Sequence, residues 1–575
     1  MKREGIWRVL LEFAKANAKP VGWSLVGGLA LSILSGVAQF AQQRGQFMSQ
    51  TTSFRDFGLP VAWMGIWKRS ADLVNARFYF YWSPFLQNCL FWGSVVFASI
   101  VLYLLLRGRL PLPLLPLYVV GLASARIQLE FQMALALRGH SFRSIQIDPF
   151  TYAQITAYFV MALLLFPNII ALISRIRFAE IFRLSCMGFP IILMPPTVDY
   201  YLLNNPMTYN FFVSETFARG VNPLSYFAVL SGGIKFEIAL VASATLAYLL
   251  YRTRSVLRSV LAVLAVIMAF LLVSTPALTA RINLTFTQPQ YFAGFLILTY
   301  LLIILSLAIA QPRMGRTIVR RTRLRGIHFP AMALFGAFLA HQAILSTHFQ
   351  NDYGVIVAGV FIVFLVWQTA TVFDDIYDRD EESSPTYLAY GILAALMAVL
   401  SAIPFGLWPL LLTLLAVYLA LDYPRLRRKH YLMPGIVIGV SSSAAFLFGA
   451  LMPILSRWPP QPIGPVALAI FAVFSGGSLL KDITGVKADR QAGLPTIFTQ
   501  FETKKALAAV ATFVAAGMIL PAVFLRTLFD LILFVGMGVA TWLLIVLAKD
   551  RSYRTVLVLY FLMGTWVFLR MFVLR

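Results

Sequence analysis

Long apolar runs alternate with short polar connectors along the whole chain, and this alternation predicts membrane-spanning helices. A helix needs about 20 mostly apolar residues to cross the hydrocarbon core of a bilayer. Up to residue 311, eight runs meet or approach this length, and the third, which is rich in proline (PLPLLPLY), is the weakest. The eight runs lie near 21–41, 88–106, 110–127, 153–174, 185–203, 234–251, 257–275 and 289–311.

The second half of the chain continues the pattern with shorter connectors. From His328 onward nine runs follow one another, each long enough for one crossing. They lie near 328–346, 354–374, 387–404, 407–422, 433–453, 463–480, 504–525, 528–548 and 555–573. We therefore predict an all-α integral membrane protein, in which a nine-helix bundle is preceded by about eight further transmembrane helices.

Basic residues cluster in alternate connectors and predict which side these connectors face. Residues 312–326 (PRMGRTIVRRTRLRG) hold six arginines in fifteen positions, and later basic connectors read PRLRRKH, KDITGVKADR and KDRSYR. Short loops rich in Lys and Arg remain on the cytoplasmic side of a membrane. We expect an N-terminal multi-span membrane domain of unknown role (1–311), a basic cytoplasmic linker (312–326) and a second membrane domain (327–575).

The composition agrees with a membrane location and favours membrane lipid over nucleic acid as a binding partner. The chain is 60% hydrophobic and only 12% charged, with a mean hydropathy of +0.80, whereas soluble domains carry about 25% charged residues. The net charge of +24 resides in the connectors, where it suits anionic membrane lipid and does not indicate nucleic acid. No phosphate-loop, dinucleotide or zinc-protease motif is present. A multi-pass protein of a prokaryotic plasma membrane fits these features.

One acidic stretch stands apart from this background. Six of the nine residues from Asp374 to Glu382 are acidic, in a chain with only 23 Asp and Glu in total. Carboxylates crowded at the end of an apolar run repel one another, and hard divalent cations with oxygen ligands neutralise them best. On a helix Asp375, Asp378 and Glu382 share one face. A solvated acidic helix end is the simpler alternative.

Two further cytoplasmic connectors complement the acidic stretch. Tyr423–Lys429 (YPRLRRK) follows the fourth run of the second half, and Lys481–Gly493 (KDITGVKADRQAG) follows the sixth. Asp482 and Asp489 are seven residues apart, so a helical path presents both on one side. Two groups of carboxylates with intervening Lys and Arg suit a magnesium-bound diphosphate. A lipid tail on that diphosphate would explain a site at the membrane face.

These three segments resemble the motifs of the UbiA-type family of intramembrane prenyltransferases. That family has nine helices, an Asn-Asp-x-x-Asp-x-x-x-Asp motif after the second helix, a Tyr-x-x-x-Lys motif, and an Asp-x-x-x-Asp-type motif after the sixth. The resemblance covers about residues 315–575 and includes the ending RQAGLPTI. The corresponding residues are Asp374, Asp375, Asp378 and Glu382 in the first motif, Tyr423 and Arg427 in the middle one, and Asp482 and Asp489 in the last.

The sequence departs from the family pattern at several of these positions. Asp374 replaces Asn, Glu382 replaces Asp with a longer reach, and Arg427 replaces Lys while keeping the charge. Gly485 stands where the family usually has an Asp that helps a second metal ion. Thr484 or Asp489 could supply the missing ligand.

The resemblance implies a Mg²⁺-dependent transferase that moves a prenyl group from a prenyl diphosphate to a lipophilic acceptor at the cytoplasmic face, as in lipid or quinone biosynthesis. It implies catalytic roles for Asp375, Asp378, Tyr423, Asp482 and Asp489. The implied metal ligands are Asp375, Asp378, Glu382, Asp482 and Asp489, and the implied diphosphate ligands are Arg427, Lys481 and Lys487. Tyr423 could stabilise a carbocation with its ring or anchor the helix at the interface.

Three other interpretations remain open from the sequence. A polytopic lipid or small-molecule transporter would also need charges in its membrane domain, although nearer the bilayer midplane. A UbiA-like protein without catalytic activity, serving as a binding or scaffold protein, would explain the loss of a carboxylate at Gly485. The family also includes enzymes that transfer phosphoribosyl groups to polyprenyl phosphate.

Overall fold

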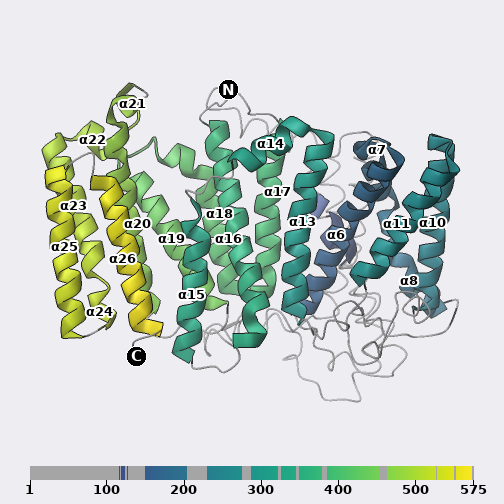
Figure 1. Cartoon of the computed structure of the whole chain (residues 1–575), viewed down its shortest axis with the longest axis horizontal. Coiled ribbons are helices and arrows are strands. Elements are labelled where there is room, and N and C mark those ends of the chain that lie inside the picture. Colours follow the sequence, from purple (N-terminus) through teal and green to yellow (C-terminus); the bar gives the residue numbers. More distant parts are fainter. Residues whose placement is uncertain are drawn as a thin grey trace, which may run out of the picture. The chain divides into compact units, whose positions relative to one another are not determined.

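The computed structural model describes the chain from residue 115 to residue 572 with gaps (Figure 1). The predicted runs 21–41 and 88–106 lie outside the described residues, and the run 110–127 lies partly outside them. The described residues are 115–116, 118–123, 126, 149–201, 203, 230–274, 287–321, 326–344, 349–377, 385–452, 463–491, 493–525, 527–548 and 552–572.

Most of the described residues are helical and none lies in a strand, as the sequence predicts. Ten helices are long and apolar enough to cross a membrane, and three further apolar helices are shorter. The chain divides into two compact units, Met1–Arg320 and Arg321–Arg575. Each unit is considered separately below.

In the first unit, α6 packs against α7, α11 and α13. Most of its helices match predicted runs, but the run 185–203 begins earlier, at Phe178, and is broken into three pieces. Pro190, Pro195 and Pro196 lie in this segment and cannot donate the backbone hydrogen bonds of one continuous helix. The elements are α6 (Pro149–Ser174), α7 (Phe178–Gly188), η4 (Phe189–Leu193), α8 (Met194–Tyr201), α10 (Gly232–Thr253), α11 (Val256–Ser274), α13 (Gln288–Ala310) and α14 (Pro312–Arg321).

The helix α14 covers most of the arginine-rich segment. Met314 and Ile318 are buried, while Arg313, Arg316 and Arg320 are exposed. This division into an apolar and a basic face is typical of a helix that lies along a membrane surface, where arginines meet the headgroups.

In the second unit, the nine predicted runs are all found as helices of the described residues. Short helices, η6 (Ile403–Phe405), η7 (Asp482–Gly485), α21 (Val486–Gln491), α22 (Ile497–Gln500) and α24 (Ala522–Leu525), join some of them. The nine are α15 (His328–Ile344), α16 (Phe349–Tyr377), α17 (Pro385–Ala402), α18 (Leu407–Leu426), α19 (Met433–Leu451), α20 (Ile463–Lys481), α23 (Thr503–Ile519), α25 (Leu528–Ala548) and α26 (Ser552–Phe572).

Small residues let the helices of this unit approach closely. A side chain at Gly336 of α15 would lie 2.1 Å from the carbonyl oxygen of Phe446, and one at Gly449 of α19 would lie 1.8 Å from that of Ala333. Close backbone contact of this kind is a common way to join helices in lipid, where hydrophobic burial alone gives little drive. The bundle also joins α16 to α17 and α18, α19 to α20, and α20 to α23.

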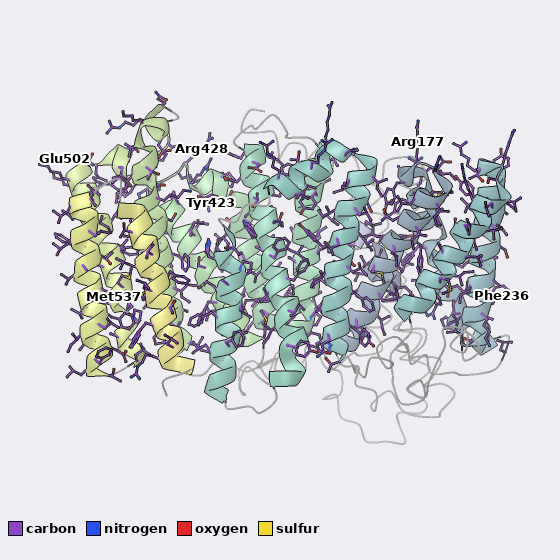
Figure 2. All side chains as sticks on the ribbon, in the orientation of Figure 1. Arg177, Phe236, Tyr423, Arg428, Glu502 and Met537 are labelled. Atoms are coloured by element: carbon purple, nitrogen blue, oxygen red, sulfur yellow. The ribbon has the colours of Figure 1, made fainter. Side chains whose placement is uncertain are left out.

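The two ends of the second unit differ in character. Figure 1 shows α21 and α22 at one end and α24 at the opposite end. Figure 2 shows Tyr423, Arg428 and Glu502 at the end that carries α21 and α22. The three segments singled out in the sequence follow α16, α18 and α20, and their meeting is described next.

Candidate active site

The end of α16 carries the first acidic segment as far as the structure describes it. Asp374 and Asp375 lie in the last turn of this helix, which ends at Tyr377. Asp375 is buried and accepts a hydrogen bond of 3.0 Å from the hydroxyl of Tyr387, on α17. Asp378 and Glu382 lie outside the described residues, so their predicted place on one face with Asp375 stays a prediction.

The end of α18 binds directly to this acidic end. Arg427 forms an ion pair with Asp374, with 3.3 Å between Nη1 and Oδ1. The guanidinium of Arg428 lies 4.6 Å from the centre of the Tyr377 ring, which is a cation–π distance. Tyr423 is half-buried one turn before Arg427. The middle motif and the first acidic motif are therefore in contact.

The second acidic segment starts where α20 gives way to η7. Ile483 of η7 packs in a hydrophobic cluster with Ile497, Phe498 and Leu507, which fixes this turn to the bundle. Asp482, its neighbour, has a buried Oδ2 atom that has no hydrogen-bond partner among the described residues. A buried carboxylate oxygen without a partner is costly, and such atoms point to an ion or ligand that belongs there.

Charges from all three segments act on one another here. Asp482 interacts electrostatically with Asp489 and Lys481 of its own segment, and with Arg427 of α18. Burial raises the pKa of Asp489, and the positive charges of Arg427 and Lys481 oppose that rise. Arg427 therefore lies between the two acidic segments, because it also pairs with Asp374.

The carboxylate of Asp489 lies beside Gly485, where the family has its missing carboxylate. A side-chain Cβ at Gly485 would lie 3.4 Å from Oδ2 of Asp489, so the carboxylate of Asp489 occupies the space beside this glycine. The hydroxyl of Thr484 instead donates a hydrogen bond of 2.9 Å to the Lys481 carbonyl oxygen. Of the two candidates for the missing ligand, the carboxylate of Asp489 is the one directed toward the vacant position.

The basic residues of this segment are less tightly placed. Lys481 is exposed at the end of α20 but acts on both Asp482 and Asp489. Lys487 is also exposed, and no ion pair in the described residues joins it to either carboxylate. Beyond it, Gly493 has a φ of +64°, a left-handed conformation that favours glycine and turns the chain toward α22.

A complete metal site is not formed by the described residues alone. Among them, no group of three or more His, Cys, Asp and Glu side chains is arranged to hold a metal ion. The described carboxylates Asp375, Asp482 and Asp489 supply the oxygen donors that Mg²⁺ prefers, and Asp378 and Glu382 lie outside the described part.

Sequence reasoning missed two contacts at this site. Tyr387, which holds Asp375, comes two residues after the proline that starts α17. The short connection from Asp378 to Ser384 brings the start of α17 back to the end of α16, and this connection length was the available signal. Arg428 belongs to the basic connector PRLRRKH, from which the sequence predicts only the side of the membrane, and its stacking on Tyr377 also ties α18 to α16.

Comparison with known proteins identifies the family of part of the second unit. Residues 379–566 match the model of the UbiA prenyltransferase family. The second unit therefore contains a domain of this family, whose members are intramembrane prenyltransferases, and the chain is a multi-pass integral membrane protein. The matched residues all lie in the second unit.

Two solved structures are similar to part of the chain. One is described as giving insights into digeranylgeranylglyceryl phosphate synthase in membranes; it is 17% identical over 44% of this chain and 97% of its own, with a TM-score of 0.34. The other is the apo structure of a UbiA homolog from Aeropyrum pernix K1, 18% identical over 43% of this chain and 98% of its own, with a TM-score of 0.33. A search of curated proteins gives no match.

Proposed function

We propose that the second unit transfers a prenyl group from a prenyl diphosphate, bound with Mg²⁺, to a lipophilic acceptor held among its helices. The observation that carries this proposal is the position of Arg427, which pairs with Asp374 and acts on Asp482 and Asp489. An arginine between two acidic segments suits a diphosphate whose oxygens are shared between metal ions and basic side chains.

The carboxylates of the site fit Mg²⁺. In the described part of the chain, Asp482 Oδ2 is buried without a hydrogen-bond partner, and a cation at this oxygen would remove the cost of leaving it unpaired. We assign the metal ligands as Asp375, Asp378, Glu382, Asp482 and Asp489. When bound, Mg²⁺ would neutralise the diphosphate oxygens and favour their departure from the prenyl carbon.

Asp489 takes the role that the family gives to the missing carboxylate at Gly485. Its Oδ2 lies beside the glycine, and its pKa is raised by burial, as expected of a carboxylate that awaits a cation. The non-catalytic alternative rests on the loss of a ligand at Gly485, and the position of Asp489 beside this glycine supports the catalytic proposal instead.

The basic and aromatic residues act on the two ends of the donor. Arg427 and Lys481 bind the diphosphate and stabilise the charge that develops on it as the carbon–oxygen bond breaks. Lys487, which is exposed, closes over the diphosphate from the surface. Tyr423, one turn before Arg427, faces the positive charge of the prenyl carbon with its ring.

We propose the following domain organisation. Residues 327–575 form the transferase domain, residues 1–311 a second membrane domain, and residues 312–326 a linker at the cytoplasmic surface. The division of the chain near Arg320 and the exposed arginines of α14 support it. The active site then faces the cytoplasm, and a prokaryotic plasma membrane is the natural setting.

The test is release of diphosphate by the purified full chain. Prenyl diphosphates of several chain lengths are incubated with and without Mg²⁺, in the presence of a lipid extract as the source of acceptor. We expect Mg²⁺-dependent release by the natural chain and by Glu502→Gln, which alters an exposed carboxylate at the same end (Figure 2). Release should disappear in Asp375→Asn and Asp482→Asn.

Three outcomes separate the transferase proposal from its alternatives. If no prenyl diphosphate is consumed while the protein stays folded, the transferase proposal is wrong. Incubation with phosphoribosyl diphosphate and polyprenyl phosphate then tests the phosphoribosyl alternative. Uptake of labelled lipid into proteoliposomes, unaffected by the Asp482→Asn exchange, would favour the transporter.

A further inference from the structure

The first unit contains an apolar cavity that the transferase proposal does not use. Its volume is about 440 Å³, and its walls come from α6, α7, η4, α10 and α11. Hydrocarbon and aromatic side chains such as Leu163, Phe166 and Val266 make up most of the lining. A cavity with this lining suits an apolar chain better than a polar small molecule.

One arginine lines this mostly apolar space. Arg126 is 1% exposed and donates a hydrogen bond to the carbonyl oxygen of Ile192 in η4. A cationic side chain is expensive at membrane depth and is by default a sign of function. A guanidinium offers five donors in a planar fork, which matches phosphate oxygens well.

The cavity extends along α10, with the carboxylate of Glu237 toward one end. Glu237 lines it near the start of α10, and Tyr248 lines it three turns later, about 16 Å away along the helix axis. Figure 2 shows Phe236, the neighbour of Glu237, at the end of the unit opposite to Arg177. The polar end and the apolar length together fit a headgroup and a long chain.

The wall is open between α7 and α10. Leu184 of α7 and Leu240 and Val241 of α10 line the cavity and are still 38–39% exposed. The segment Phe178–Pro196, which begins with α7, and the helix α10 are both apolar enough to span a membrane, so these side chains would face lipid. Beyond the opening, Glu180 of α7 pairs with Arg252 of α10 at 2.9 Å and holds the two helices together. A molecule could therefore enter sideways from the bilayer.

We propose that this cavity binds a membrane lipid with a phosphodiester headgroup, the phosphate near Arg126 and one chain along α10. Glu237 lines the same cavity, and its negative charge disfavours a doubly charged headgroup. A phosphodiester carries one negative charge, whereas a prenyl monophosphate carries up to two. The site is independent of the active site in the second unit.

Native mass spectrometry of the full chain tests this lipid site. The protein is stripped of lipid and titrated with phosphatidylglycerol, geranylgeranyl phosphate or diacylglycerol. We expect one tightly held phosphatidylglycerol, weaker geranylgeranyl phosphate and no retained diacylglycerol. Arg126→Gln should weaken phosphatidylglycerol binding about tenfold, as loss of one charged hydrogen-bonding partner does.

A second variant fills the cavity without touching Arg126. Gly188 lines the cavity, and a Cβ there meets no atom within 4 Å, so Gly188→Leu should fold and exclude the chain. Gly294→Leu is the matched control, since Gly294 of α13 is equally open but lies outside the lining. Equal lipid retention in Gly188→Leu and Gly294→Leu would overturn the proposal, and so would diacylglycerol retained as well as phosphatidylglycerol. Tighter geranylgeranyl phosphate would overturn the phosphodiester assignment.

Discussion

Two clusters of charged residues lie in the second unit, and they are built differently. The inner cluster consists of Asp374, Asp375, Arg427, Asp482 and Asp489, from α16, α18 and the segment after α20. The outer cluster consists of Thr527, Asp530, Trp566 and Arg570, at the start of α25 and the end of α26. Both are anchored on apolar helices, yet only one of them satisfies its carboxylates within the protein.

In the outer cluster, protein groups donate hydrogen bonds to both carboxylate oxygens of Asp530. Asp530 is 0% exposed; its Oδ1 accepts a hydrogen bond from Trp566 at 2.9 Å, and its Oδ2 accepts bonds from Thr527 at 2.5 Å and Arg570 at 3.2 Å. One carboxylate faces one cation, and every oxygen has a donor. Such an arrangement fixes two helices together and leaves nothing for a ligand to bind.

The inner cluster has more acid than its bases balance. Arg427 interacts with three carboxylates, Asp374, Asp482 and Asp489, and Lys481 with the last two. Within the described residues, Asp482 Oδ2 has no hydrogen-bond donor. A protein holds like charges together in this way at sites where a ligand completes the balance. The contrast separates a structural charge from a functional one within a single bundle.

The largest effect on stability should come from the outer cluster. Asp530→Ala leaves Arg570 without its partner, and breaking a buried ion pair costs about 3–5 kcal/mol. We expect a lower free energy of unfolding, measured by denaturant titration in detergent, with prenyl transfer unchanged in the molecules that remain folded. Unaltered stability would mean that the outer cluster is not structural, and the comparison would fail.

In the inner cluster, loss of a carboxylate should lower activity and not stability. Asp482→Asn removes a metal ligand, and we expect activity to fall about 100- to 1000-fold, which corresponds to about 3–4 kcal/mol. Because Asp482 is partly buried next to the like charge of Asp489, the melting temperature should stay the same or rise when its charge is removed. A matching fall in stability would make Asp482 a structural residue instead.

The hydrogen bond from Tyr387 to Asp375 is expected to position the inner cluster. Tyr387→Phe removes the hydrogen bond to Asp375, and a bond to a charged group contributes about 1.5–3 kcal/mol. We expect about a tenfold loss of activity together with a higher Mg²⁺ concentration for half-maximal rate, measured from Mg²⁺ titrations. A loss that excess Mg²⁺ cannot reduce would assign Tyr387 to packing.

The smallest effect is expected at Gly485. A Cβ there would lie 3.4 Å from Asp489, which is an ordinary van der Waals contact, so Gly485→Ala should change activity less than about twofold. Gly485→Asp would bring a second carboxylate against Asp489 and should lower activity unless Asp489→Ala is added. Steady-state rates of the three variants check this, and a gain in Gly485→Asp alone would show that Asp489 is not the replacement ligand.

The helices were predictable because bilayer thickness imposes one length on every span. The nine runs of the second half and the spans from α6 onward follow from that constraint. The broken segment from Phe178 to Tyr201 did not, since three prolines interrupt an apolar run without shortening it.

The inner cluster was predictable as a set of segments but not as a set of contacts. Charge placed the three segments on one side, yet only the structure describes Arg427 between Asp374 and Asp482. The outer cluster gave no signal, because Asp530 and Arg570 lie 40 residues apart in the sequence. The cavity of the first unit could not be predicted from the sequence either, because its lining residues have the same apolar pattern as any membrane-spanning helix.

Binding of a non-reactive prenyl thiolodiphosphate tests the central claim most directly, because it separates binding from turnover. Calorimetry of the full chain should show tight binding only when Mg²⁺ is present. That binding should be lost in Asp482→Asn and kept in Glu502→Gln. Equal binding with and without Mg²⁺, or equal binding by both variants, would contradict a metal–diphosphate site in the inner cluster.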